Sequence, residues 1–305
     1  MNQLARSSAT LKGPDGHESP GPQPASVIQW QNVSKRFWKG REAKTILNDV
    51  SLDVRRGEFL TVVGPSGCGK TTLLNIAAGL THASGGRVFY DGSEIRGVNR
   101  RVGYLTQKDT LLPWRRVRDN VMLPLQLQGV PARQRRQAAD EILDRVGLAD
   151  FKEHYPAELS GGMRRRVLIA RTLVYNPETL LMDEPFVALD AQTQLKLQND
   201  LLRLWEETSL TVVFVTHDLA EAVALADRVV ILARPPHGIR DMRDVDIERP
   251  RDVRAVRSDP RFGQLHDDLW RGLGSTMAEG GEAGDGELSG DLAGKQPAPG
   301  SGVGA

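Results

Sequence analysis

Two segments near the beginning of the chain alternate apolar and polar residues, VIQWQNV (27–33) and ILNDVSLDV (46–54). This period of two is typical of antiparallel strands with one buried face. Later segments are apolar without interruption, which predicts strands buried on both faces of a sheet. These are FLTVV (59–63), TLLMD (179–183), TVVFVT (211–216) and RVVILA (228–233). Two shorter strands are predicted at RVFYDG (87–92) and RVGYLTQ (101–107).

Helical patterns lie between these strands, at 71–80, 191–207 and 218–226. Strands that alternate with helices indicate a mainly parallel sheet with helices on both faces. The residues from about 110 to 167 differ, because they read as several helices in succession. The sequence therefore predicts an α/β fold with a mainly parallel sheet core, an antiparallel β subdomain and an inserted α-helical subdomain.

Both ends of the chain are rich in Gly, Ser and Pro and poor in residues that could be buried. We expect a disordered arm at 1–26 and a disordered tail at 276–305. Between them we expect the folded body at 27–255 and a helical extension at 256–275. The first residues lack the apolar core of a secretory signal, and no apolar run approaches the ~20 residues of a membrane-spanning helix.

The 305 residues carry a formal net charge of +1 and a single cysteine, Cys68. A nearly neutral chain argues against a nucleic acid as partner, since nucleic-acid-binding proteins normally present a basic face. A single thiol cannot form an internal disulfide, which fits a reducing compartment.

The segment GPSGCGKT (64–71) follows a predicted buried strand and precedes a predicted helix. It matches the phosphate-binding loop G-x-x-x-x-G-K-[ST] in the strand–loop–helix context that this motif requires. The glycines let backbone N–H groups wrap around a phosphate, and the helix N-terminus adds positive potential. Lys70 is expected to contact the β- and γ-phosphates, and the Thr71 hydroxyl to bind Mg²⁺. ATP is therefore the predicted ligand, bound by Gly64, Pro65, Ser66, Gly67, Cys68, Gly69, Lys70, Thr71 and Thr72.

Two carboxylates follow one another at the end of a predicted strand, Asp183 and Glu184. Consecutive residues that leave a strand point to different sides, so one carboxylate can face a metal ion while the other faces an attacking water. Phosphoryl transfer needs both a held metal and a positioned nucleophile. Taken alone, the pair could equally cap a helix. Together with the phosphate-binding loop, it predicts Asp183 as a Mg²⁺ ligand and Glu184 as the catalytic base.

The segment LSGGMRRR (159–166) opens a predicted helix with Ser160, Gly161 and Gly162. Their N–H groups and the helix dipole form a second potential anion site. One compact domain cannot easily bring two such helix ends to one ATP. We therefore expect a head-to-tail pair of chains, with each ATP between the phosphate-binding loop of one chain and this segment of the other. Taken alone, the segment could also be an ordinary Ser-capped helix.

With these motifs in this order, the chain resembles the ABC ATPase family of P-loop NTPases. The motifs are GPSGCGKT, YLTQ, LSGGM, LLMDEP, ALD and THD. The resemblance implies that Gln107 contacts Mg²⁺ or its water and senses the transport partner, and that His217 contacts the γ-phosphate. It also implies that Asp190 lies at a dimer seam. An aromatic side chain would stack on adenine; we choose Phe37, with Trp38 as the rival.

Several segments are similar to the ATPases of nitrate, sulfonate and taurine importers in particular, among them LLPWRRVRDNV (111–121), EPFVALD (184–190) and SDPRF (258–262). Val187 stands where that group has Gly, beside the carboxylates and not on them. The resemblance implies an ATPase that drives transport of a small oxyanion, peripheral on the cytoplasmic face of the inner or plasma membrane. Its implied partners are a second ATPase subunit, membrane permease subunits and, indirectly, a periplasmic or lipoprotein substrate-binding protein.

Two other kinds of ABC protein remain as alternatives. One is the motor of a lipid transporter or exporter, and the other is a non-transport protein of DNA repair or translation. Non-transport members usually carry coiled-coil inserts or two cassettes, and this sequence shows neither. The apolar segment LLPW (111–114) also has two interpretations. It could form a groove for a short helix of a membrane partner, or it could pack inside the helical subdomain.

Overall fold

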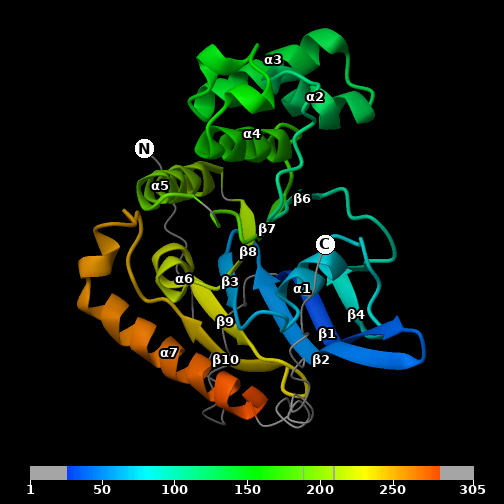
Figure 1. Cartoon of the computed structure of the whole chain (residues 1–305), viewed down its shortest axis with the longest axis vertical. Helices are drawn as coiled ribbons and strands as arrows, with labels where there is room; N and C mark the ends of the chain where they lie inside the picture. Colours follow the sequence, from blue (N-terminus) through cyan, green and yellow to red (C-terminus); the bar gives the residue numbers. More distant parts are fainter. Residues whose placement is uncertain (1–25, 188, 209, 282–305) are drawn as a thin grey trace, which may run out of the picture.

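The structure, a computed structural model, describes residues 26–187, 189–208 and 210–281. In Figure 1 three helices form an upper lobe above a larger body that contains the sheets. These helices are α2 (Val117–Leu127), α3 (Ala132–Arg145) and α4 (Gly161–Leu173). They fall in the part of the chain where the sequence predicts an inserted helical subdomain, although α4 continues beyond residue 167.

The first strands of the chain form an antiparallel sheet in the body, in the order β2-β1-β4-β5. They are β1 (Ser26–Lys39), β2 (Glu42–Arg55), β4 (Gly85–Tyr90) and β5 (Ser93–Glu94). A second sheet has the order β10-β9-β3-β8-β7-β6, in which only the edge strand β10 runs antiparallel to its neighbour among the described strands. It comprises β3 (Phe59–Val63), β6 (Val102–Leu105), β7 (Thr179–Asp183), β8 (Thr211–Thr216), β9 (Arg228–Leu232) and β10 (Ile239–Asp244).

Helices cover both faces of the second sheet. Successive side chains of its buried strands point to opposite faces, so each strand contributes to two cores. On β3, Phe59 and Val63 belong to the core that α5 and α6 share, whereas Leu60 and Val62 pack in the core with α1. The helices of the body are α1 (Lys70–Ala77), α5 (Ala191–Thr208), α6 (Leu219–Leu225) and α7 (Pro260–Gly281). Short 3₁₀ turns occur at Ala149–Phe151, Pro156–Glu158 and Val256–Ser258. The predicted α/β architecture with an antiparallel subdomain and a helical insertion is confirmed.

The structure differs from the prediction at the ends of several elements. Strands β1 and β2 extend into one long hairpin, since their register continues to the pair Lys39–Glu42. Strand β1 already begins at Ser26, inside the expected arm. Helix α7 runs to Gly281, six residues into the expected tail, because each residue added to an existing helix gains a hydrogen bond without a new nucleation cost. The rest of the expected arm and tail lies outside the described residues.

No helix in the described ranges combines the length and the apolar character needed to cross a membrane.

Candidate active site

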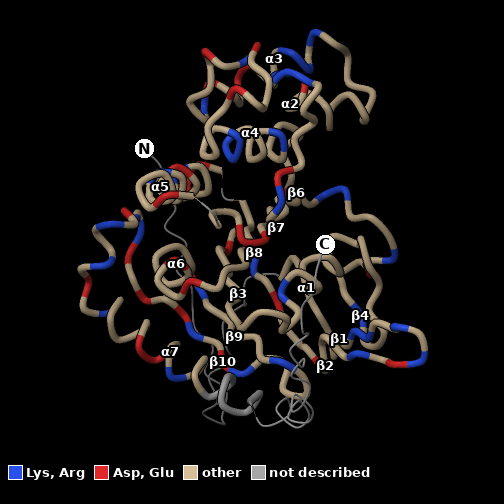
Figure 2. The backbone as a smooth tube through the Cα atoms, in the orientation of Figure 1, with Lys and Arg blue, Asp and Glu red and all other residues tan. Residues whose placement is uncertain are grey.

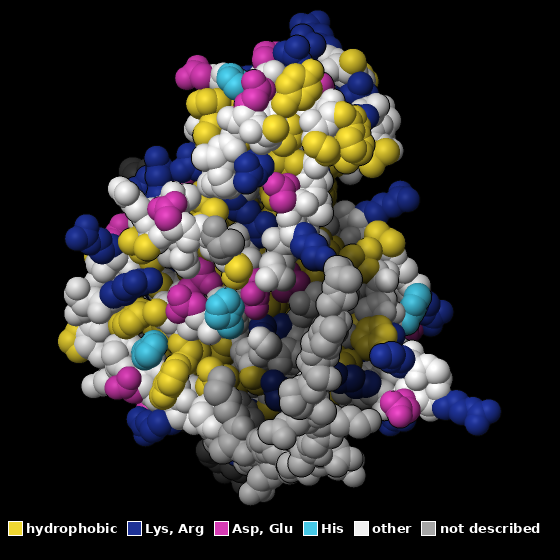
Figure 3. All heavy atoms as spheres, viewed as in Figure 1, with side chains coloured by type: hydrophobic (Ala, Val, Ile, Leu, Met, Phe, Trp, Pro, Cys, Tyr) yellow, Lys and Arg dark blue, Asp and Glu magenta, His cyan; other side chains and the backbone are white. Residues whose placement is uncertain are grey.

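The predicted catalytic residues gather where four neighbouring parallel strands end. The sheet places β3, β8, β7 and β6 side by side. These strands lead into Gly64, His217, Glu184 and, after one further residue, Gln107. Ligands of open α/β sheets bind at the carboxyl ends of the strands. In Figure 3, acidic side chains gather near the middle of the surface, below the helical lobe.

The phosphate-binding loop has a backbone path that requires glycine. Gly67 and Gly69 have φ angles of 79° and 106°, in the left-handed region that favours glycine. A Cβ on Gly64 would lie 2.2 Å from the carbonyl oxygen of Leu232 and 2.8 Å from Cys68 Sγ. Helix α1 begins directly after Gly69, so its N-terminal N–H groups point toward the loop. The loop therefore has the open backbone that a phosphate needs.

Lys70 and Asp183 are buried next to this loop. Lys70 Nζ donates to the carbonyl oxygen of Gly64 at 2.8 Å. Asp183 is hydrogen-bonded to the Thr71 side chain, yet burial raises the pKa of its carboxyl above the usual value, and nearby Glu184 raises that pKa further. A divalent cation would offset this desolvation and favour the ionised carboxylate. The carboxylate of Asp183 and the hydroxyl of Thr71 are also the hard oxygen donors that Mg²⁺ prefers.

Glu184 points to a different group of side chains because its backbone turns sharply. Its φ is 44°, an uncommon value for a residue other than glycine and one that concentrates at functional sites. Its Oε1 lies 3.9 Å from Lys70 Nζ. Its Oε2 accepts a hydrogen bond from Gln107 Nε2 at 3.3 Å and lies 3.4 Å from His217 Nδ1. Three of the predicted residues thus surround one carboxylate that is adjacent to the phosphate-binding loop.

A hollow of about 410 Å³ extends from the loop to the antiparallel sheet. Phe37 on β1 lines it and is 46% exposed, whereas Trp38 is 70% exposed and does not line it. A space with polar loop atoms at one end and an aromatic ring at the other suits an adenine nucleotide. The lining residues are Phe37, Ile46, Ser66, Gly67, Gly69, Lys70, Thr71, Thr72, Gln107 and Glu184.

The second predicted anion site lies elsewhere in the chain. Ser160 caps α4, and its Oγ accepts a hydrogen bond from the backbone N–H of Met163 at 3.3 Å. A Cβ on Gly162 would lie 2.5 Å from Cγ2 of Thr193 on α5. Asp190 accepts from the backbone N–H of Thr193 at 2.9 Å, and this bond lowers the pKa of its carboxyl. These residues therefore meet where the N-terminal ends of α4 and α5 pack, apart from α1 in Figure 1.

Comparisons with known proteins agree with this geometry. A family model described as ABC transporter matches residues 47–187. An uncharacterised ABC transporter ATP-binding protein of Methanocaldococcus jannaschii is 50% identical over 230 residues, which cover 75% of this chain and 86% of the relative. The chain belongs to the ABC transporter family. It is an ATPase of the ABC type, with ATP and Mg²⁺ as its cofactors, as the sequence predicts.

Other relatives carry more specific names. An aliphatic sulfonates import ATP-binding protein of Bacillus licheniformis is 46% identical, covering 71% of this chain and 84% of the relative. A nitrate import ATP-binding protein of Synechococcus elongatus is 43% identical, covering 78% and 88%. A solved ATP-binding cassette, described as a dimer in a post-hydrolysis state bound to ADP and Pi, superposes with a TM-score of 0.65 and 34% identity. That match covers 72% of this chain and 100% of the solved one.

The sequence does not single out two residues in or next to this site. Ile46 on β2 lines the hollow, and nothing in its strand pattern distinguishes it from its neighbours. Arg165 on α4 is buried, and its Nη1 donates to the carbonyl oxygen of Thr106, the residue before Gln107. A signal for Arg165 was available, because it shares a helical spacing with Leu168, Ile169 and Thr172, which are all buried (165, 168, 169, 172).

The two ends of the apolar LLPW segment (111–114) differ in burial, and each agrees with a different one of its two interpretations. Leu111 is buried and belongs to the same core as Val117 and Val121 of α2, as expected for packing inside the helical lobe. Trp114 at the other end of the segment is 72% exposed. An exposed aromatic side chain of this size is available to a partner.

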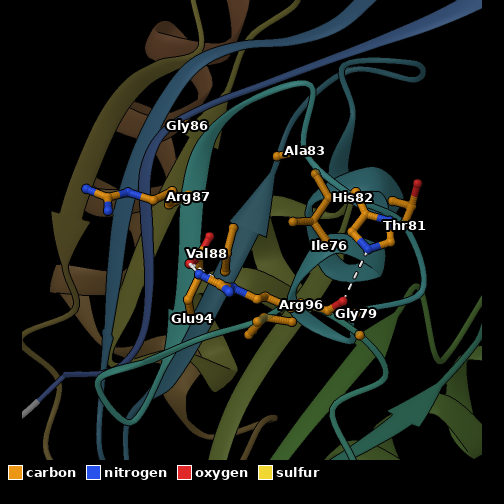
Figure 4. A pocket seen from close by; sticks show the side chains of 12 residues that line it. Ile76, Gly79, Thr81, His82, Ala83, Gly86, Arg87, Val88, Glu94 and Arg96 are labelled. Atoms are coloured by element: carbon orange, nitrogen blue, oxygen red, sulfur yellow. Dashed lines mark hydrogen bonds and ion pairs between the residues drawn. The ribbon is translucent and has the colours of Figure 1, made fainter.

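A second hollow, of about 350 Å³, lies at the opposite end of α1 from the phosphate-binding loop (Figure 4). His82 Nε2 lies 3.3 Å from the carbonyl oxygen of Arg96 there. Arg96 also pairs with Glu94 at 2.8 Å. None of the predicted site residues lines this hollow, so the candidate active site is the one at the loop end of α1.

Proposed function

We propose that this chain hydrolyses ATP to drive an importer of a small oxyanion, namely an aliphatic sulfonate, taurine or nitrate. The observation that carries the ATPase role is the arrangement of Lys70, Gln107 and His217 around the Glu184 carboxylate, beside the phosphate-binding loop. The sulfonate and nitrate import names of relatives at 43–46% identity support the substrate class.

In this proposal Glu184 accepts the proton of the attacking water. Gln107 and His217 hold the Glu184 carboxylate in place, at 3.3 and 3.4 Å, because a base must be oriented toward the proton that it accepts. Lys70 would balance charge on the terminal phosphates, and Thr71 with Asp183 would hold Mg²⁺. The bound Mg²⁺ supplies charge neutralisation for the phosphates.

The proposal includes a head-to-tail pair of chains, which we take to be a homodimer. The two helix ends that we expect to bind phosphate, at Lys70 on α1 and at Ser160 on α4, lie apart in the described chain (Figure 1). A second copy would bring its Ser160–Gly162 segment to the nucleotide that the first copy holds. The dimeric state of the solved cassette supports this arrangement. The pair would bind permease subunits at the cytoplasmic face of the membrane and act indirectly on a substrate-binding protein.

Glu184→Gln tests the ATPase role. The variant keeps the shape of the side chain but loses its basicity, so we expect phosphate release to fall by about 10²–10⁴-fold while ATP still binds. Light scattering with ATP and Mg²⁺ should then show a persistent dimer. Glu94→Gln is the matched control, since Glu94 pairs with Arg96 outside the nucleotide hollow. Hydrolysis at the wild-type rate in Glu184→Gln would remove Glu184 from its proposed role.

The substrate class needs a separate experiment. A strain that lacks this gene should fail to grow with sulfonate or taurine as sole sulfur source, or with nitrate as sole nitrogen source. The wild-type gene should restore growth and the Glu184→Gln gene should not. If the deletion strain grows normally on all three, the oxyanion proposal is wrong while the ATPase proposal stands, and a lipid transporter or exporter becomes the better candidate.

A further inference from the structure

The segment that carries Gln107 has no regular secondary structure, and residues 106–110 are held by one helix. Side chains of α4 contact this segment at three points. Arg165 Nη1 donates to the carbonyl oxygen of Thr106 at 3.0 Å, Arg171 Nη1 donates to that of Thr110 at 2.8 Å, and Arg164 Nε lies 3.2 Å from Asp109 Oδ2. Figure 2 shows the basic residues of α4 in blue, above the ends of β6 and β7.

Arg165 differs from its neighbours in its burial. Only 6% of it is exposed, whereas the side chain of Arg164 is 37% exposed. Burial lowers the pKa of the Arg165 guanidinium to about 10, against the opposing attraction of the Asp109 and Asp183 carboxylates. Its Nε and Nη2 make no hydrogen bond to any described residue. A buried cation with one hydrogen bond costs stability, and an apolar side chain of similar volume would be as good for folding or better. Folding therefore does not explain this arginine.

The position of its single hydrogen bond suggests another role. Thr106 is the residue before Gln107, and the Gln107 amide contacts Glu184 Oε2. One hydrogen bond thus joins α4 to the backbone that presents Gln107 to the catalytic carboxylate. The bonded atom is a backbone carbonyl, so the contact fixes the path of the main chain at this point.

We propose that Arg165 is a positioning residue of the ATPase, which holds the Thr106 carbonyl and thereby keeps the Gln107 amide against Glu184. The inference rests on the ATPase function proposed above. Arg165 also stands five residues after Ser160 on the same helix. A displacement of α4 caused at its Ser160 end therefore reaches Gln107 of the same chain.

The test begins with Arg165→Met, which fills the volume but removes the charge and the donors. A misplacement of about 1 Å can cost on the order of 10²-fold in rate, so we expect kcat for ATP hydrolysis to fall between about 10- and 100-fold. The KM for ATP should stay within about twofold, since the residue does not touch the nucleotide hollow. Thermal unfolding should show an unchanged or higher Tm, because a buried cation with one hydrogen bond is removed.

Arg135→Met is the matched control. Arg135 lies on α3 in the helical lobe, its Nη1 donates to the carbonyl oxygen of Val130 at 2.8 Å, and its buried Nε has no partner among the described residues. It therefore shares with Arg165 a hydrogen bond to a backbone carbonyl and a buried nitrogen without a described partner, at a half-buried position away from the Gln107 segment. We expect wild-type kcat in this variant.

A double variant separates positioning from a general structural effect. If Arg165 acts through Gln107, Gln107→Ala with Arg165→Met should be no slower than Gln107→Ala alone. Losses that multiply, a wild-type kcat in Arg165→Met, or an equal loss in Arg135→Met would each overturn the inference. In each of these cases the wild-type protein would still hydrolyse ATP, and only the inference about Arg165 would fail. If the proposed function itself is wrong, the wild-type protein would not hydrolyse ATP.

Discussion

The aromatic wall of the nucleotide hollow can be removed with little effect on the fold. Phe37 lies near the end of the β1–β2 hairpin, paired with Lys44, and almost half of it is exposed. Its ring also lies 4.8 Å from Lys35 Nζ. Because substitutions at such exposed positions usually change stability by no more than about 0.5 kcal/mol, Phe37→Ala should unfold like the wild type. We predict that the variant instead binds ATP more weakly.

The size of the effect follows from stacking. An aromatic side chain that stacks on a base contributes about 1–3 kcal/mol, as measured by alanine substitution. At about 1.4 kcal/mol for each tenfold change, the Kd for ATP should rise between about 5- and 150-fold. The phosphate-binding loop is unchanged, so the Kd for inorganic tripolyphosphate, which has no base, should stay at the wild-type value.

Isothermal titration calorimetry with both ligands measures this prediction, in a Glu184→Gln background that prevents turnover. Trp38→Ala is the matched control, because Trp38 is the next residue of the same hairpin and does not line the hollow. It should bind ATP like the wild type. If Phe37→Ala retains wild-type affinity, the stacking assignment is wrong. If Trp38→Ala shows the loss instead, the stacking residue is Trp38.

Two further predictions concern stability. Gly64→Ala should lower the free energy of unfolding by about 1–3 kcal/mol, because its Cβ would meet the Leu232 carbonyl. The control Gly97→Ala should be neutral, since nothing lies within 4 Å of its Cβ. Urea unfolding compares the two variants. Burial raises the pKa of Glu221, so its contribution to stability is full below its unfolded pKa and is lost as the pH rises through its folded pKa. Glu221→Gln keeps the acceptor for Gln198 Nε2. Its free energy of unfolding relative to the wild type should therefore increase from pH 4 to pH 8 in the same assay. A difference that does not change with pH would contradict this.

The parts of the site that the sequence predicted are those that local patterns encode. Strands β3, β7 and β8 are buried on both faces, so uninterrupted apolar runs revealed them and placed Asp183 and His217 at their ends. The phosphate-binding loop is a contiguous motif whose glycines the backbone requires at Gly64, Gly67 and Gly69. Where chemistry and structure are both local, a single sequence is sufficient.

The parts that the sequence did not predict depend on partners distant in the chain. Strand β10 has the sequence IRDMRD and shows no clear apolar alternation, because only its pairing with β9 makes it a strand. The sequence offered no decisive signal for choosing Phe37 over Trp38, because the two are neighbours of the same chemical type, and only the packing of the hairpin shows that Phe37 lines the hollow. Arg165 was one of three consecutive arginines, and its partner Thr106 is 59 residues away.

The position of Arg165 bears on how two ATP sites in the proposed dimer would depend on each other. Helix α4 would present its Ser160 end to the ATP of the partner chain, while Arg165 on the same helix fixes Gln107 in its own chain. Ser160 and Arg165 are separated by about one and a half helical turns. Over this distance the 13-residue helix moves as one rigid element. Binding at one site would therefore bias the contact between Gln107 and Glu184 at the other. Coupling of this kind needs no flexible relay, because both contacts belong to one helix.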